Sequence, residues 1–296
     1  MSDLRLDPVS EPFKASITPP GSKSLTNRAL VIAALADGRS RLANVLFADD
    51  TRVMFEGLAK LGFDLAIDEP GHAVTMTGHG GTIGASAARL FCGNSGTTIR
   101  FLTALASLGH GEFTLDGVAR MRQRPIGALV GVLKNLGVRT SFSPEAEGFP
   151  PITVLADGLP GGICRYGAEA SSQFLSALLM VAPYARNEVR IDLEPNQTSW
   201  PYVAMTMRLM DHFGITCELI RDPDTGEPKK IIVPRGVYSP HDYPIEPDAS
   251  NASYFLGAAA IHPGAKTTIE KLGKRSLQGD VAFADVLHDM RTGLIF

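Results

Sequence analysis

The segment VMFEGLAKLGFDLAI (residues 53–67) decides the fold, because one short run contains a helix, its end and a strand. Apolar residues recur at helical spacing as far as the pair Leu-Gly, and a strand-like run follows at once. Gly62 can take the left-handed conformation that closes a helix C-terminus. The segment therefore predicts an α/β unit in which a helix leads directly into a strand.

Two later segments repeat this pattern, at residues 128–142 (ALVGVLKNLGVRTSF) and 204–219 (AMTMRLMDHFGITCEL). Their closing glycines are Gly137 and Gly214, so the three helix ends lie 75 and 77 residues apart. Near-equal spacing of this kind indicates an internal repeat, with a unit longer than that of ordinary solenoid proteins.

Each repeat holds a second apolar helix that begins with small polar residues. These helices are expected at residues 25–36, 95–109 and 171–185, the first of them ending at Asp37-Gly38. Alternating or β-branched runs between the helices are interpreted as strands, at residues 41–47, 112–117, 189–194 and 229–236. The order strand–helix–strand–helix–strand–strand, built three times, predicts an α/β fold.

A fourth unit begins near Asp242, with a helix at 250–262, a strand at 266–272 and a helix at 280–290. The chain then ends in RTGLIF, where the repeat would place a Leu-Gly-strand passage. On the pattern of the repeat, we expect the fourth unit to be incomplete.

The composition is that of an ordinary globular protein, with 44% hydrophobic and 20% charged residues among 296. A net charge of −3 argues against nucleic acid or a membrane surface as a partner recruited by bulk charge. The three cysteines are far apart and the seven histidines lack metal spacing, so neither a disulfide framework nor a metal site is predicted. The N-terminus lacks an apolar signal segment and no run approaches a membrane span, which predicts a cytoplasmic protein.

Polar clusters open four of the expected helices: GSKSLTNR, GNSGTTIR, ASSQF and DASNAS. One interpretation is helix capping, which favours Ser, Asn and Asp. The other is a shared polyanion site, because helix N-termini attract anions and two clusters add the cations Lys23, Arg28 and Arg100. A nucleotide-binding P-loop is excluded, since Ser22 precedes Lys23 where that motif needs glycine.

Two further features have both a structural and a chemical interpretation. Arg120, Arg122 and Arg124 alternate just before Pro125, which is expected at the first position of a helix. They are either a solvated charge run or a guanidinium clamp for carboxylate or phosphate. Asp248 precedes a Ser- and Asn-rich helix start, so it is either an N-cap or a general base.

Six stretches in this order resemble the 5-enolpyruvylshikimate-3-phosphate (EPSP) synthase family, and they span about Ile17 to Met290. They are PGSKSLTNRAL, GNSGTTIRFL, RMRQRPIGALV, SSQFLSALLM, SWPYVAM and EPDASNASYFLGAAAI. The resemblance implies an enolpyruvyl-transferase fold, an inside-out α/β barrel of repeated βαβαββ units. It also implies a complete three-repeat domain at residues 21–236 and a partial second domain at 1–20 and 237–296.

The reaction implied by the resemblance is transfer of the enolpyruvyl group from phosphoenolpyruvate to the 5-hydroxyl of shikimate 3-phosphate. Phosphate is released after addition and elimination through a tetrahedral intermediate. The resemblance implies no metal or organic cofactor, and the expected assembly is a monomer. Both substrates are anions, so local cations and helix dipoles suit the chemistry.

The resemblance also implies roles for single residues. Lys23 matches a lysine that contacts both substrates, and Asp248 matches the carboxylate that accepts the proton of the attacking hydroxyl. The residues expected to hold shikimate 3-phosphate are Lys23, Ser24, Arg28, Ser171, Ser172, Gln173, Ser199, Tyr202 and Asp248. Those expected to hold phosphoenolpyruvate are Lys23, Asn94, Gly96, Thr97, Arg124 and Gln173. A side chain at Gly96 would intrude on that substrate.

Family members continue beyond this chain, which leads us to expect a truncated gene or a frame change near Arg291. Two alternatives stay open. The chain could be a fragment that binds shikimate 3-phosphate without turnover, or a member of the sister family that transfers enolpyruvyl to UDP-N-acetylglucosamine. The sister family needs a reactive cysteine on a mobile loop, whereas Cys92 is expected to be a packed thiol. The stretches SKSLTNR, SSQ and QRP favour the shikimate branch.

Overall fold

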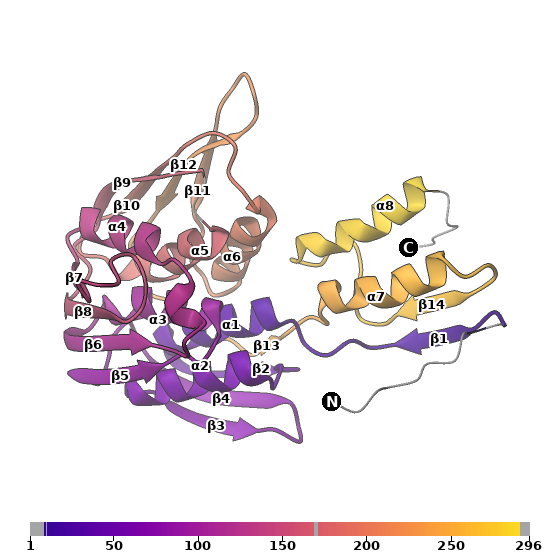
Figure 1. Cartoon of the computed structure of the whole chain (residues 1–296), viewed down its shortest axis with the longest axis horizontal. Coiled ribbons are helices and arrows are strands. Elements are labelled where there is room, and N and C mark those ends of the chain that lie inside the picture. The colour runs from indigo at the N-terminus through magenta and orange to yellow at the C-terminus, as the bar shows by residue number, and fades with distance from the viewer. Residues whose placement is uncertain (1–8, 10, 169–170, 291–296) are drawn as a thin grey trace.

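A computed structural model describes residues 9, 11–168 and 171–290 and contains three similar α/β units (Figure 1). The second unit has the full pattern: β5 (Ala87–Phe91), α3 (Gly96–Ala106), β6 (His110–Asp116), α4 (Gly127–Asn135), β7 (Arg139–Phe142) and β8 (Ile152–Asp157). Its sheet has the order β5-β6-β8-β7. Strands β5 and β6 are parallel, and the other neighbours are antiparallel. This is the predicted βαβαββ unit.

The third unit repeats this topology. It consists of β9 (Gly162–Tyr166), α5 (Ser172–Val181), β10 (Val189–Leu193), α6 (Trp200–His212), β11 (Glu218–Arg221) and β12 (Pro228–Val233). Short 3₁₀ turns, η1 (Met121–Gln123) and η2 (Ala182–Tyr184), lie before α4 and after α5. Its sheet order, β9-β10-β12-β11, is the same as that of the second unit.

The first unit takes its opening strand from a distant part of the chain. Its consecutive elements are α1 (Lys23–Leu35), β2 (Asp37–Ala43), α2 (Asp49–Lys60), β3 (Asp64–Asp68) and β4 (Ala73–His79). The missing strand is β13 (Tyr243–Pro244), which pairs in parallel with β2. This strand lies outside the range 21–236 expected for the three-repeat domain, and the domain boundaries remain a prediction.

The fourth unit also takes its first strand from elsewhere. Strand β1 (Lys14–Ile17) pairs in parallel with β14 (Lys266–Ile269), and α7 (Ala249–Ala260), η3 (Gly279–Ala282) and α8 (Phe283–Asp289) pack beside them. The chain therefore crosses between the first and fourth units twice. At this crossing the amide of Ser22 donates to Glu246 (2.9 Å) and that of Asp248 donates to Pro20 (2.8 Å). The expected frame change near Arg291 lies outside the described residues.

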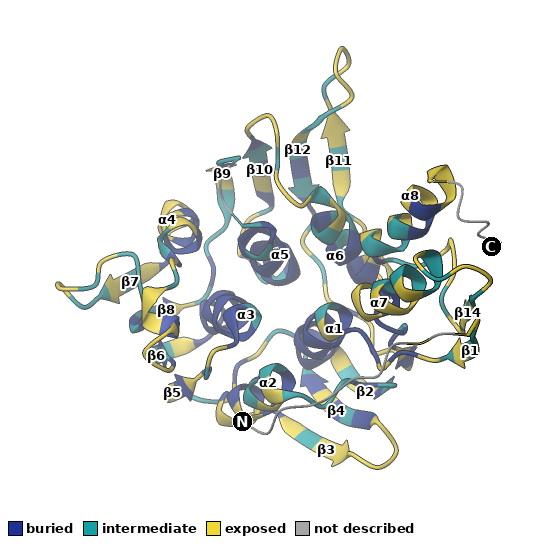
Figure 2. Ribbon diagram, turned by 45° about the vertical axis from the view of Figure 1, so that its right-hand side comes forward, coloured by how far each residue is buried: buried dark blue, intermediate teal, exposed yellow. Residues whose placement is uncertain are grey.

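One helix of each of the three units lies inside, and the sheets lie outside. Figure 2 shows α1, α3 and α5 as dark blue ribbons at the centre of the three units, with the strands around them. Buried positions number eleven of thirteen in α1, ten of eleven in α3 and nine of ten in α5. The inside-out α/β architecture expected from the sequence is therefore confirmed.

The predicted helix ends are confirmed at all three glycines. Gly62, Gly137 and Gly214 have φ angles of 98°, 89° and 91°. In each case the amide after the glycine donates back five residues; that of Phe63, for example, reaches the carbonyl of Leu58 at 3.1 Å. These bonds satisfy carbonyl groups that the helix leaves unpaired, and they turn the chain into the next strand.

Two predicted boundaries are wrong. Asp37-Gly38 does not end α1 as a cap but opens β2, where Asp37 pairs with His79, so the predicted strand 41–47 lies at 37–43 instead. Pro125 is not the first residue of α4. The amide of Ile126 donates to Gly148 (2.9 Å) in another loop, and this tertiary bond delays the helix to Gly127.

Candidate functional site

The four polar helix starts all act as caps. The side chains of Ser22, Ser95, Ser171 and Asp248 accept backbone N–H groups at the starts of α1, α3, α5 and α7. The capping interpretation of these clusters is therefore confirmed. Capping satisfies part of each N-terminus, and the helix dipole still leaves partial positive charge there.

These helix starts lie close to one another. The hydroxyl of Thr98 in α3 donates to the carbonyl of Asp50 in α2 at 2.9 Å. Lys23 at the start of α1 also reaches Asp50, with 3.3 Å between Nζ and Oδ2. Arg100 of α3 donates to Gln173 of α5. The tertiary structure therefore gathers the polar starts of α1, α2, α3 and α5 on one side of the three units.

Lys23 is the exposed cation of this group. Its side chain is 47% exposed and its carboxylate partner Asp50 is 30% exposed. Sequence analysis missed Asp50 as a site residue, because an acidic residue in the first turn of a helix such as α2 is common. An exposed pair of this kind is weak, so the lysine can exchange this partner for an anionic ligand.

Asp248 is buried, with 7% of its surface exposed, and joins two helix starts. One carboxylate oxygen accepts the amide of Asn251 at 2.8 Å and the other accepts the amide of Lys23 at 3.2 Å. Both oxygens are thus engaged by backbone N–H groups. This geometry ties α7 to α1, which is a structural role beside the expected one as a proton acceptor.

Arg28 is a buried cation held by neutral groups. Its guanidinium donates to Thr206 (2.7 Å), Ser176 (3.0 Å) and the carbonyl of Ser24 (3.0 Å), and it lies 6.0 Å from the ring of Tyr202. Burial lowers the pKa of Arg28 to about 9, against a smaller opposing effect of Tyr202. Among the described residues no ion pair joins Arg28 to a carboxylate.

Only one member of the expected arginine clamp faces a helix start. Arg124 donates to the carbonyl of Asn94 at 2.9 Å, and its guanidinium occupies the space that a side chain on Gly96 would need. Arg122 pairs instead with Asp116, with Nη2–Oδ2 at 2.5 Å, and Arg120 donates to Gln123 at 2.9 Å. The interpretation of three arginines as one clamp is therefore wrong, and Arg124 alone lies at the start of α3.

The remaining predicted residues also lie at helix starts. Thr97 is the second residue of α3, and Ser172 is the buried first residue of α5. The carbonyl of Ser171 accepts the hydroxyl of Tyr166 at 2.6 Å. Ser199 has a left-handed φ of 53° and its carbonyl accepts the amide of Tyr202, which places both at the beginning of α6. 

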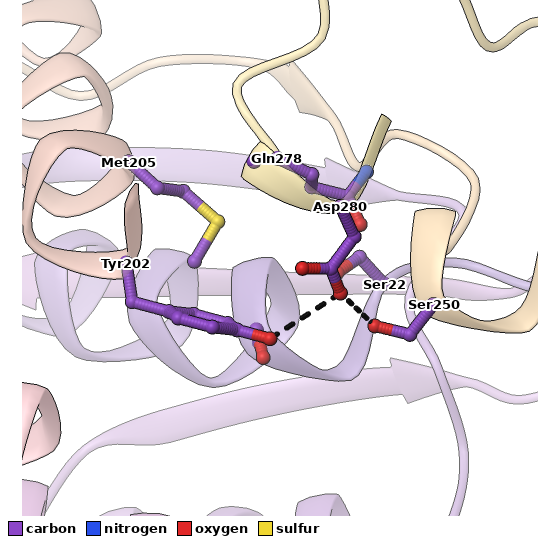
Figure 3. Close-up of a pocket in the computed structure, with 8 residues that line it drawn as sticks. Ser22, Tyr202, Met205, Ser250, Gln278 and Asp280 are labelled. Atoms are coloured by element: carbon purple, nitrogen blue, oxygen red, sulfur yellow. Dashed lines mark hydrogen bonds between the residues drawn. The ribbon is translucent and has the colours of Figure 1, made fainter. Parts of the chain in front are cut away.

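A small pocket lies between the three units and the fourth unit, which are in contact beside it. It is lined by Ser22, Ser24, Tyr202, Met205, Ser250, Gln278, Gly279 and Asp280. Figure 3 shows Asp280 between Tyr202 and Ser250, and the hydroxyl of Tyr202 donates to it at 3.3 Å. Sequence analysis missed Asp280 and Gln278, because Asp280 has the ordinary place of an acidic residue at the start of the predicted helix 280–290. Only the fold brings Asp280 to Tyr202 and Gln278 to the start of α7.

The cysteines behave as packed thiols. Burial raises the pKa of Cys92, Cys164 and Cys217 to about 12 in each case. The expectation for Cys92 is confirmed, and a high thiol pKa argues against the reactive cysteine of the sister family. Across the described residues, no three His, Cys, Asp or Glu side chains gather as a metal site would require. No helix in that part of the chain is long and apolar enough to cross a membrane.

Comparison with known proteins agrees with this geometry. A sequence model of the family described as EPSP synthase (3-phosphoshikimate 1-carboxyvinyltransferase) matches residues 9–294. The 3-phosphoshikimate 1-carboxyvinyltransferase of Trichormus variabilis is 42% identical over 291 residues, covering 98% of this chain and 66% of the relative. The enzyme of that name from Shewanella sp. strain MR-7 is 44% identical, covering 98% of this chain and 67% of the relative.

A solved EPSP synthase from Acinetobacter baumannii has the same fold. It superposes with a TM-score of 0.76 at 25% sequence identity, covering 90% of this chain and 57% of that chain. The chain thus spans about two thirds of the length of the relatives it matches and somewhat more than half of the solved structure.

Proposed function

The chain belongs to the EPSP synthase family, and from that premise we propose that it binds shikimate 3-phosphate and phosphoenolpyruvate at the gathered helix starts. The proposed reaction joins the 5-hydroxyl oxygen of shikimate 3-phosphate to C2 of phosphoenolpyruvate, while a proton adds to the methylene carbon. The tetrahedral intermediate then loses phosphate and a proton from the new methyl group, which restores the double bond. We further propose a monomer that works in the cytoplasm.

The observation that carries this proposal is the set of cations without carboxylate partners. Arg28, Arg100 and Arg124 lie at or near the helix starts, and in the described residues none of them forms an ion pair with an acid. Arg28 and Arg100 are buried and Arg124 is half-buried, and burying guanidinium groups without counter-charge is costly unless a ligand supplies that charge. Two substrates that each carry a phosphate and a carboxylate would supply it.

The proposed roles divide between the two substrates. Lys23, at the start of α1, would lie between them, with Ser24 and Arg28 beside the shikimate carboxylate. Ser171, Ser172 and Ser199 would bind its phosphate, and Tyr202 would line the ring. Phosphoenolpyruvate would lie at the start of α3 against Gly96, within reach of Asn94, Thr97, Arg124 and Gln173. Asp248 stays the proposed proton acceptor, a role that competes with its two backbone bonds.

The first test measures binding and turnover separately. Trp200 is the single tryptophan and follows Ser199 directly, so its fluorescence should report shikimate 3-phosphate binding. Calorimetry with the same ligand gives the affinity, and phosphate release on addition of phosphoenolpyruvate gives turnover. Absence of shikimate 3-phosphate binding would contradict the proposed function.

Three variants test the assigned roles. Lys23→Ala should weaken binding of both anions, since one ammonium group serves both. Asp248→Asn keeps one acceptor oxygen for the capping bond from Asn251 and loses the acceptor for the amide of Lys23, so it should largely spare binding and stop turnover if Asp248 is the base. Gly96→Ala should hinder phosphoenolpyruvate alone, because the added methyl group meets Arg124. Unchanged turnover in Asp248→Asn would remove Asp248 from the reaction.

A second candidate function is binding of shikimate 3-phosphate without turnover. It is favoured by Asp248, because both of its carboxylate oxygens accept backbone amides, which is the arrangement of a helix cap. The same pair of measurements decides between the two candidates. Shikimate 3-phosphate binding with no phosphate release supports the second, and release at ordinary enzymatic rates excludes it.

A further inference from the structure

We propose that Arg100 is a positioning residue that sets the arrangement of Gln173 and Arg124 around phosphoenolpyruvate. The inference rests on the proposed function, and it adds a residue that the family resemblance does not assign. Arg100 lies in the second turn of α3, one turn beyond Gly96. From there its side chain links the three elements that would carry the phosphoenolpyruvate site.

The contacts of Arg100 reach each of these elements. One guanidinium nitrogen donates to the side-chain oxygen of Gln173 in α5, and another reaches the carbonyl of Pro125 at 3.4 Å. Pro125 follows Arg124 directly, so the second bond holds the loop that carries this arginine. The guanidinium also lies 4.8 Å above the ring of Phe174, which limits its movement.

The bond to Gln173 fixes the direction of its amide. Because the oxygen of Gln173 accepts from Arg100, the NH₂ group is left to donate elsewhere. An amide that donates is suited to a phosphate or carboxylate oxygen. Without Arg100 the amide could rotate and present its oxygen, which would repel an anion.

The charge of Arg100 acts on Arg124 as well. Arg100 is 8% exposed, and burial, followed by the charge of Arg124, lowers its pKa to about 10. Two guanidinium groups therefore lie near each other with neutral partners, a carbonyl oxygen for Arg124 and an amide and a carbonyl for Arg100. A bound anion between α3 and Arg124 relieves this repulsion, so the pair favours the occupied site.

An arginine with a purely structural role would be expected to pair with an acid instead of with groups of the candidate site. Arg122, in the same loop region, is more than half exposed and forms a two-bond pair with Asp116 at 2.9 and 2.5 Å. Arg100 is buried and donates only to groups at the candidate site. Lysine could keep the charge at position 100, but it lacks the planar fork that reaches Gln173 and Pro125 together.

The test uses Arg100→Lys and Arg100→Gln, with Arg122→Lys and Arg122→Gln as matched controls. Shikimate 3-phosphate affinity is followed by Trp200 fluorescence, and phosphoenolpyruvate affinity by calorimetry with shikimate 3-phosphate saturating. We expect Arg100→Lys to weaken phosphoenolpyruvate binding about tenfold and Arg100→Gln about a hundredfold, as loss of charged hydrogen bonds implies. Shikimate 3-phosphate affinity should fall clearly less than phosphoenolpyruvate affinity, because Gln173 is one of many residues expected to hold it, and the Arg122 variants should match the wild type.

The outcomes separate this inference from the proposed function. Phosphoenolpyruvate affinity unchanged in both Arg100 variants would overturn the inference and leave the proposed function intact. Equal loss of both ligands, with a matching fall in melting temperature, would show a structural role and also overturn it. If the wild-type chain binds shikimate 3-phosphate but no phosphoenolpyruvate, the inference fails together with that half of the proposed function.

Discussion

Helices α1 and α7 occupy the same place in the repeat, yet their environments differ. Each follows a capped polar start, with Ser22 before α1 and Asp248 before α7, and the helices are 13 and 12 residues long. In α1 eleven residues are buried, whereas in α7 only Ala249 and Ala252 are. Tyr254 of α7 is 76% exposed. Similar local sequence therefore produces the same element with very different burial.

The difference lies in what surrounds each helix. Helix α1 packs against α2, α3, α5 and α6 and against strands β2 and β4, at the centre of three sheets. Helix α7 packs against α8, η3 and β14 beside a two-stranded sheet, and Figure 2 shows much of it in yellow and teal. Capping and propensity form both helices, and burial of α1 depends on units that pack against it from other parts of the chain.

The largest expected difference between α1 and α7 is in how often each helix unfolds locally. Amides in α1, α3 and α5 lie within the buried centre, while those in α7 and α8 have few buried apolar contacts. We expect native-state hydrogen exchange to be at least about a hundredfold slower in α1 than in α7, since local opening follows burial. Mass spectrometry of peptides from the two helices measures this ratio. Equal protection would mean that α7 is stabilised as strongly as α1.

A matched pair of substitutions sharpens the contrast at single residues. Leu30 and Leu256 lie eight positions after their caps; Leu30 is fully buried, and Leu256 is half-buried. Leu30→Ala should lower the free energy of unfolding by roughly 2–5 kcal/mol, through lost transfer energy and a cavity. Leu256→Ala should cost less than about 1 kcal/mol, because its site is partly solvated. Denaturant titration measures both, and costs of similar size would contradict the comparison.

Alkaline pH should act on the three units and not on the fourth. The pKa values of Cys92, Cys164, Cys217 and Tyr184 are raised by burial to about 12, from ordinary values of 9.0 for the thiols and 10.0 for the tyrosine. The folded state keeps these groups neutral. The stability that this contributes is fully present below their ordinary pKa values and is lost as the pH rises through the raised pKa values of the folded state. Between about pH 8 and pH 10 we expect a loss on the order of 1 kcal/mol for each thiol, and so several kcal/mol for the group together.

Melting curves in reducing buffer test this pH dependence. The described part of the fourth unit beyond β13 contains no cysteine. After correction for the intrinsic pH dependence of exchange, hydrogen exchange in α7 should therefore change far less with pH than exchange in the three units. Cys92→Ala should flatten the fall in melting temperature, since it removes one of the titrating groups. A melting temperature that is constant over this pH window would contradict the buried, neutral state of the thiols.

Local signals predicted much of this fold. The glycines at 62, 137 and 214 were found because a left-handed residue after an amphipathic helix is a short-range feature. Strand β13 was missed, since two residues carry no periodicity and their partners, Leu42 and Ala43, are distant in the sequence. Pro125 was misplaced for a related reason: a bond from Ile126 to Gly148 delays the helix.

The residues of the candidate site likewise fall into those that local sequence identified and those that only the structure identified. Lys23, Gly96 and Asp248 stood out because each belongs to a polar helix start, and each is found at one. Asp50 and Asp280 did not stand out, because their importance comes from partners 27 and 78 residues away, Lys23 and Tyr202. Sequence patterns recognise residues whose neighbours are close along the chain; these two have their partners in other elements.

By itself, the sequence determined the repeat, the helix ends and the capped polar starts, because each depends on residues within a few positions of one another. The tertiary structure decided which starts meet, which arginine faces Gly96 and which is paired with Asp116. It also decided that α1 is buried and α7 exposed, since burial belongs to the surroundings of a helix. These outcomes need long-range packing, whose energy depends on elements that are distant in the chain.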